Sequence, residues 1–130
     1  MVAESHGRVA VMFRNYPLTR IHRYAMKAAI AAECASDAGR FAAYHDALYR
    51  FQDSLGVWTW SQYARLAKIN DIARLEDCIA HQRTLARIEH DRAVGDTLHI
   101  ESTPTFIAGG MMFMGTVPDS VWHALIGTGQ

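Results

Sequence analysis

Apolar and polar positions repeat along this chain with a period that changes from stretch to stretch, and each change marks a new element. Residues 8–14 (Arg-Val-Ala-Val-Met-Phe-Arg) form a short apolar run between polar ends, which predicts a buried strand. Pro17 follows closely and cannot extend a hydrogen-bonded ladder, so the strand ends before it.

From residue 21 to residue 95 the apolar spacing is that of helices. The alanine-rich stretch 21–36 predicts the first helix and Gly39 predicts its end. Thr59 and Gln62 fit a capping box, and Asp71 caps a later helix. The inward positions of the second to fifth helices recur every three or four residues: Phe41, Tyr44, Leu48 and Phe51; Tyr63, Leu66 and Ala67; Ile72, Leu75 and Ile79; Leu85, Ile88 and Ala93 or Val94.

The last quarter has the pattern of a β-hairpin followed by one helix. Strands over residues 105–108 and 111–114 flank Gly109-Gly110, which suits a two-residue turn with positive φ at both positions. Alternation places Phe113 on one face, facing the core, and its two neighbouring methionines on the other. For that other face we expect contact with a helix; the alternative is an adaptable apolar groove. Pro118 fits the first turn of a closing helix, whose buried side is Val121, Trp122 and Leu125.

Length and charge narrow the class of protein. The 130 residues predict one domain. Thirteen basic and thirteen acidic residues cancel, which argues against a nucleic-acid or anionic-membrane partner. No stretch approaches the roughly 18 apolar residues of a membrane span. Residues 1–8 have no apolar core of the signal-peptide type, so these residues carry no export signal and, as written, predict a cytoplasmic chain.

The residues that could carry chemistry are few. Seven scattered histidines show no His-x-x-x-His spacing, so we expect no metal site, and we expect no cofactor because phosphate-binding loops are absent. Cys34 and Cys78 stand 44 residues apart, each inside a predicted helix rather than at its N-terminus. A reactive thiol usually needs that N-terminal position. The residues themselves therefore indicate two small buried hydrophobes and no catalytic residue.

Taken in order, several fragments of the chain resemble the DsbA-like branch of the thioredoxin superfamily. The last of them, Thr-Pro-Thr-Phe at residues 103–106, resembles that family's substrate-docking loop. The others are Phe-Arg-Asn-Tyr-Pro-Leu at 13–18, Ala-Ala-Glu-Cys-Ala at 31–35, Gly-Arg-Phe at 39–41, Tyr-His-Asp at 44–46, and the run from Asp91 to Ile100. Members of the family begin with a strand and a Cys-x-x-Cys at the start of a helix. This chain starts where that helix should be finishing.

The resemblance implies an α/β, incomplete thioredoxin-like fold over residues 1–130. Its order is strand, inserted helical block (about 21–96), β-hairpin and C-terminal helix, as one domain. The family's central strand lies between those over residues 9–13 and 105–108, so its absence leaves open sheet edges. We therefore expect a homo-oligomer, such as a dimer paired through an open edge.

The resemblance also assigns roles to individual residues. It implies a cis peptide bond before Pro104 and a Thr103 backbone that binds an extended substrate; the alternative is an ordinary trans proline at a strand edge. Because some DsbA-like proteins carry a second bridge in the helical block, it offers a structural disulfide between Cys34 and Cys78. The expected partner is an unfolded or thiol-containing protein.

Three functions follow as alternatives. The first is a DsbA-like thiol–disulfide oxidoreductase domain without its own Cys-x-x-Cys, inactive as this chain alone. The second is a non-catalytic peptide-binding or dimerising module. The third is a glutathione-binding relative of the glutathione transferases. Relatives mostly work in oxidising compartments, which stands against the cytoplasmic expectation.

Overall fold

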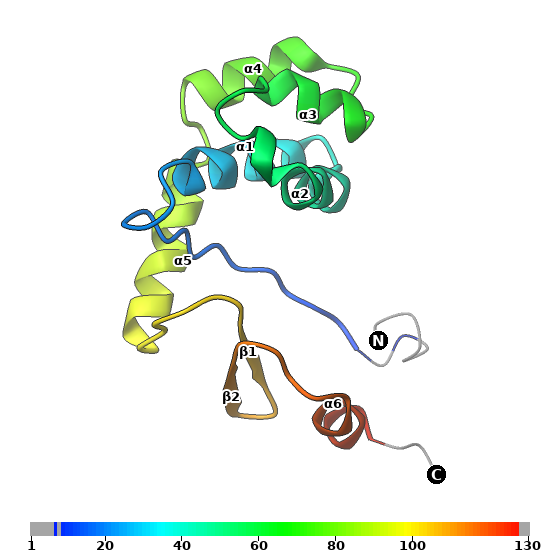
Figure 1. Ribbon diagram of the computed structural model, residues 1–130, viewed down its shortest axis with the longest axis vertical. Helices are drawn as coiled ribbons and strands as arrows, with labels where there is room; N and C mark the ends of the chain where they lie inside the picture. The colour runs from blue at the N-terminus through cyan, green and yellow to red at the C-terminus, as the bar shows by residue number, and fades with distance from the viewer. Residues whose placement is uncertain (1–6, 8, 128–130) are drawn as a thin grey trace. The chain divides into compact units, whose positions relative to one another are not determined.

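The computed structural model describes residue 7 and residues 9–127 (Figure 1). The chain divides into two compact units. The helical unit is Asn15–Ala93, and the hairpin unit combines the described parts of Met1–Arg14 and Val94–Gln130. The expectation of one domain over residues 1–130 stays a prediction. The elements in order are α1 (Ala25–Asp37), α2 (Phe41–Arg50), the 3-10 helix η2 (Gln52–Ser54), α3 (Trp60–Leu66), α4 (Ile72–Ala80), α5 (Leu85–Thr97), β1 (Thr105–Ala108), β2 (Met111–Met114) and α6 (Asp119–Ile126).

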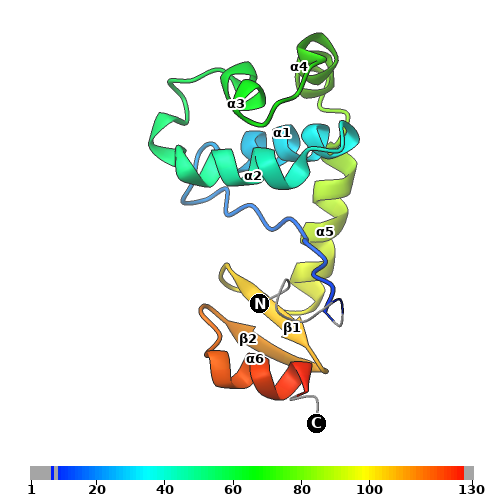
Figure 2. The same cartoon turned by 90° about the vertical axis from the view of Figure 1, so that its right-hand side faces the viewer.

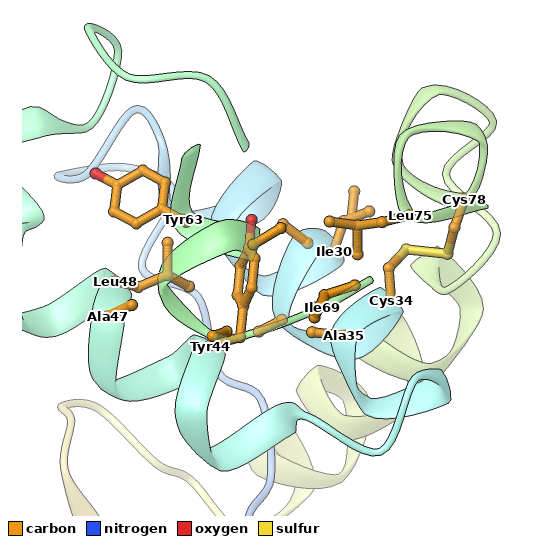
Figure 3. Close-up of a cluster of buried hydrophobic side chains, with 14 of the residues drawn as sticks. Ile30, Cys34, Ala35, Tyr44, Ala47, Leu48, Tyr63, Ile69, Leu75 and Cys78 are labelled. Atoms are coloured by element: carbon orange, nitrogen blue, oxygen red, sulfur yellow. A yellow bond between two sulfur atoms is a disulfide. The ribbon is translucent and has the colours of Figure 1, made fainter. Parts of the chain in front are cut away.

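Four helices of the helical unit close around a buried core (Figure 3). Helix α1 packs against α2 and α4, and α3 packs against the same two helices. The largest fully buried side chains are Tyr44, Tyr63, Ile30, Ile88 and Thr84. The small residues of α1 let its neighbours approach closely: Ala31 and Ala35 are fully buried.

Helix starts follow the predicted caps. The Thr59 hydroxyl accepts from the Gln62 N–H at 3.3 Å, and the Gln62 side chain accepts from the Thr59 N–H at 2.8 Å, which confirms the capping box. Asp71 accepts from the Arg74 N–H at 3.1 Å and caps α4. Helix α1 begins later than predicted, at Ala25 instead of residue 21, because residues 19–24 are taken up by turns.

Four helices end in the same left-handed turn. After α3, the Ile69 N–H donates to the Ala64 carbonyl at 2.9 Å and the Lys68 N–H donates to the Arg65 carbonyl at 3.1 Å, which is a Schellman motif. The ends of α1, α4 and α5 show the same pair of bonds. The residues in the left-handed position are Gly39 (φ 71°), Lys68 (58°), Gln82 (47°) and His99 (55°). Only Gly39 has the residue type that this position favours.

The hairpin unit is built on one antiparallel strand pair. β1 pairs with β2 in the register Thr105↔Met114 to Ala108↔Met111. Gly109 and Gly110 have φ of 58° and 77°, so the predicted two-residue turn with positive φ is confirmed. Helix α6 lies along one face of the hairpin (Figure 2), where Phe106 and Trp122 meet edge to face at 5.4 Å.

The prediction of a buried first strand is wrong. Residues 9–18 form no strand, and Val11, Met12 and Phe13 are 65, 76 and 47% exposed. An apolar run becomes a strand only when a neighbour accepts its hydrogen bonds, and within the described residues only β1 and β2 pair as strands.

Two of the predicted inward assignments are also wrong. Leu66 is 50% exposed, and of the two alternatives at the end of α5, Val94 is 42% exposed and Ala93 is exposed as well. The buried residues of α3 are Ser61, Tyr63 and Ala64, and Ala67 directly after the helix is buried too. Leu66 lies outside this narrow stripe. Along the described part of the chain, no helix is both long and apolar enough to cross a membrane.

Candidate functional site: the Pro104 loop and the hairpin edge

The loop before β1 carries the two predicted substrate-binding residues. Thr103 and Pro104 are exposed, and the peptide bond that joins them is cis. The Pro104 carbonyl accepts from the Gly115 N–H at 2.8 Å, and the Thr105 hydroxyl donates to the Ser102 carbonyl at 2.7 Å. Among the described residues, none makes a hydrogen bond to the backbone of Thr103. Its N–H and C=O therefore stay available at the surface.

One edge of β1 is open in the described part of the chain. The sheet contains β1 and β2 alone, so the side of β1 away from β2 makes no ladder there. Thr103 lies in the loop directly before β1, so its backbone and this edge follow one another along the chain. Together they form a short row of main-chain donors and acceptors of the kind that an added strand uses.

The two faces of the hairpin differ in burial. One face holds Phe106 and Phe113, both half-buried on the side where Trp122 packs. The Met face, defined as Thr105, Ile107, Met112 and Met114, is open: Ile107 is 53%, Met112 41% and Met114 60% exposed. The expected helix contact on this face is therefore wrong for the described residues. The face is an exposed apolar surface, and the alternative, an adaptable apolar groove, stays a prediction.

Cys34 and Cys78 are joined by a disulfide, with an S–S distance of 2.04 Å. The bond links α1 to α4 at the rim of the core (Figure 3). The two residues are 3% and 8% exposed. Their interpretation as two separate buried thiols is wrong, because they are buried as a pair. Since the sequence has only these two cysteines, it offers no free thiol as a nucleophile.

The buried phenols are structural donors. The Tyr44 hydroxyl donates to the Trp60 carbonyl at 3.0 Å and the Tyr63 hydroxyl donates to the Phe51 carbonyl at 2.8 Å. Burial raises the pKa of both phenols above the ordinary tyrosine value. Both therefore remain protonated near neutral pH. No cluster of three metal-binding side chains occurs among the described residues.

Asn15 is a structural residue that the sequence analysis did not single out. Its N–H donates to Asp91 Oδ2 at 2.9 Å, and its side-chain amide donates to Glu33 Oε1 at 2.8 Å. Asn15 is only 4% exposed, so it ties the entry of the helical unit to α1 and α5. Two signals for it were its place just before Tyr16-Pro17 at the end of the apolar run and its place in the Phe-Arg-Asn-Tyr-Pro-Leu fragment at 13–18.

Comparison with known proteins gives one family and several relatives. A family model described as thioredoxin matches residues 2–127. The chain is 36% identical over 107 residues to the Na(+)/H(+) antiporter NhaA 3 of Salinispora tropica, covering 82% of this chain and 16% of that protein. It is 34% identical over 108 residues to the Na(+)/H(+) antiporter NhaA 1 of Salinispora arenicola, covering 83% and 16%. The chain thus spans about a sixth of the length of these relatives. No solved structure matches it.

Proposed function

Because the chain belongs to the thioredoxin family, we propose that it is the peptide-docking part of a DsbA-like thiol–disulfide oxidoreductase. The observation that carries this proposal is the open β1 edge leading from the unpaired backbone of Thr103. An extended substrate segment would pair with this edge through main-chain hydrogen bonds. Its apolar side chains would contact the Met face, whose unbranched methionines adapt to different shapes.

The exchange chemistry needs a Cys-x-x-Cys outside these residues. In that reaction a thiolate attacks one sulfur of a disulfide, forms a mixed disulfide and expels the other sulfur as a thiolate. Cys34 and Cys78 are not the attacking pair in this proposal, because they are buried, bonded to each other and in a different unit from Thr103. The role of this chain is to hold the substrate backbone.

Binding of a labelled, extended apolar peptide tests the docking step. We expect the peptide to bind the full chain, and we expect an N-methylated copy, which lacks main-chain donors, not to bind. Ile107→Glu should weaken binding at least tenfold by placing a charge on the Met face. Val57→Glu is the matched control, because Val57 is an exposed apolar residue (81%) of the helical unit.

The outcomes separate the alternatives. Equal binding of both peptides would overturn docking by main-chain pairing. Disulfide transfer by this chain alone, lost on changing Cys34 or Cys78, would overturn their assignment as structural. A rise in Tm with glutathione that Ile107→Glu abolishes would favour the glutathione-binding alternative. Sedimentation as a dimer that the peptide dissociates would favour the dimerising module.

The named relatives support a second candidate function, as an accessory domain of a sodium–proton antiporter. Its test is a replacement in the Salinispora tropica antiporter, in which this chain substitutes for the matching 107 residues. If the proposal holds, the hybrid supports growth of a salt-sensitive host better than the antiporter with those residues deleted. A hybrid no better than the deletion would count against it.

A further inference from the structure

The helical unit contains a cavity that the docking proposal does not use. It has a volume of about 560 Å³, which falls within the range of roughly 300–1,000 Å³ typical of small-molecule sites. Its apolar lining is the Cys34–Cys78 disulfide with the buried side chains of Ile69 and Leu75. The rest of the lining is mainly charged.

Four of the seven charged residues in the lining are basic, and the side chains of three of these four have no partner among the described residues. Arg40, Lys68, Arg74 and Arg83 all line the cavity. Arg83 is paired with a lining carboxylate, that of Asp77, at 2.9 Å. The side chains of the other three make no ion pair or hydrogen bond with any described residue.

The carboxylates of the lining are already engaged. Asp37 is bound by Arg87, which lies outside the lining, at 2.9 Å. Asp77 is bound by Arg83 and by His81, at 2.9 and 3.1 Å, and its hydrogen bond to Arg83 holds the pKa of the Asp77 carboxyl below its usual value. Asp71 accepts the hydrogen bond that caps α4. The cavity is therefore left with a surplus of positive charge.

Lys68 adopts a backbone conformation that is unfavourable for a residue other than glycine. It sits in the left-handed position of the turn that ends α3, with φ of 58°, where glycine fits without strain. Gln82 occupies the equivalent position after α4, with φ of 47°, but is not part of the cavity lining. Residues with strained backbone are found preferentially at functional sites. At Lys68 the side chain is an unpaired ammonium group at the cavity.

We propose that this cavity binds a small organic anion with carboxylate or phosphate groups. The planar guanidinium groups of Arg40 and Arg74 can each bind two oxygens of such a group, and the ammonium group of Lys68 adds a third positive charge. The apolar part of the ligand lies on Ile69, Leu75 and the disulfide. The walls come from α1, α4 and the three turns between α1 and α2, α3 and α4, and α4 and α5. A bound anion therefore stabilises the folded helical unit.

Thermal unfolding of the full chain in citrate or inorganic phosphate tests this site, with NaCl holding the ionic strength constant. We expect a saturable rise in Tm of several degrees with at least one of the two anions. Citrate alone identifies a carboxylate ligand, and phosphate alone identifies a phosphate ligand. Lys68→Gln and Arg74→Gln should each reduce the rise by more than half, whereas Arg65→Gln, an exposed arginine outside the lining, should keep it.

Lys68→Gly gives the sharpest test because its two effects have opposite signs. Without anion its Tm should rise, since glycine relieves the left-handed strain, but the response to the anion should fall. Gln82→Gly should raise the Tm and keep the full response. An anion response of equal size in Lys68→Gly, Lys68→Gln and the unmodified chain would overturn the proposal, and so would the absence of any response to both anions in the unmodified chain.

Discussion

The helical unit and the hairpin unit belong to the same chain, yet they bury their apolar side chains to different degrees. The helical unit closes four helices around a core in which Ile30, Tyr44 and Tyr63 are 2, 0 and 0% exposed. In the described part of the hairpin unit, Val117, which is 6% exposed, is the only residue with a buried apolar side chain. An isolated strand pair is marginal in water. The contrast indicates that the helical unit carries most of the stability, whereas the hairpin unit leaves apolar side chains exposed.

The largest effect should come from a matched pair of isoleucine substitutions. Ile30→Ala in the helical unit should lower the free energy of unfolding by about 2–5 kcal/mol, because it leaves a cavity in the core. Ile107→Ala in the hairpin, where Ile107 is 53% exposed, should change it by less than about 0.5 kcal/mol. Chemical denaturation followed by circular dichroism measures both. Equal losses would remove the contrast between the units.

The disulfide should have the next largest effect. Replacing Cys34 and Cys78 together by alanine should lower the free energy of unfolding by about 2–4 kcal/mol, because the bond closes a separation of 44 residues. Equilibrium denaturation measures the loss, and the unmodified chain in a reducing agent is the control that should show the same change. A double variant as stable as the oxidised chain would show that packing alone holds α1 to α4.

The capping box of α3 should have a smaller effect. Thr59→Ala removes the hydroxyl that accepts from the Gln62 N–H and should cost about 1 kcal/mol. Thr116→Ala, at an exposed position of the hairpin unit, is the matched control and should stay within about 0.5 kcal/mol of the unmodified chain. Urea denaturation of the two variants compares them directly, and a larger loss in Thr116→Ala would contradict the assignment of stability to the helical unit.

The smallest effect should appear only in acid. Because the hydrogen bond from Arg83 lowers the pKa of the Asp77 carboxyl in the folded state, its contribution to stability is present above the ordinary aspartate pKa. That contribution is lost as the pH falls through the lower folded-state value. Asp77→Asn should therefore weaken the dependence of Tm on pH below about pH 4. Asp53→Asn, at another exposed aspartate of the helical unit, serves as the control, and identical pH profiles for the two variants would contradict the prediction.

Elements fixed by local chemistry could be predicted from the sequence. Thr59 and Gln62 mark a helix start because both halves of the capping box lie within one turn. Gly109-Gly110 marks the hairpin because both residues adopt positive φ there. These signals need no knowledge of distant residues, which is why the boundaries of α3, β1 and β2 follow them.

Features that depend on distant partners could not be predicted in the same way. The apolar run before Pro17 has the pattern of a strand, but no described segment pairs with it. Cys34 and Cys78 meet only because α1 packs on α4, with their Cα atoms 5.9 Å apart. The cavity has the same origin, since its lining residues from Arg40 to Arg83 share no sequence motif. Tertiary packing brings all these residues together.

The exposure of the hairpin methionines has a consequence for a protein that meets oxidants. Met111, Met112 and Met114 are 49, 41 and 60% exposed, whereas Met26 is partly buried against the core. Peroxide should convert the thioethers of the hairpin to sulfoxides before that of Met26, and each sulfoxide is polar where the thioether was apolar. Oxidation would thus make the exposed methionine surface of the hairpin polar and leave the core of the helical unit unchanged.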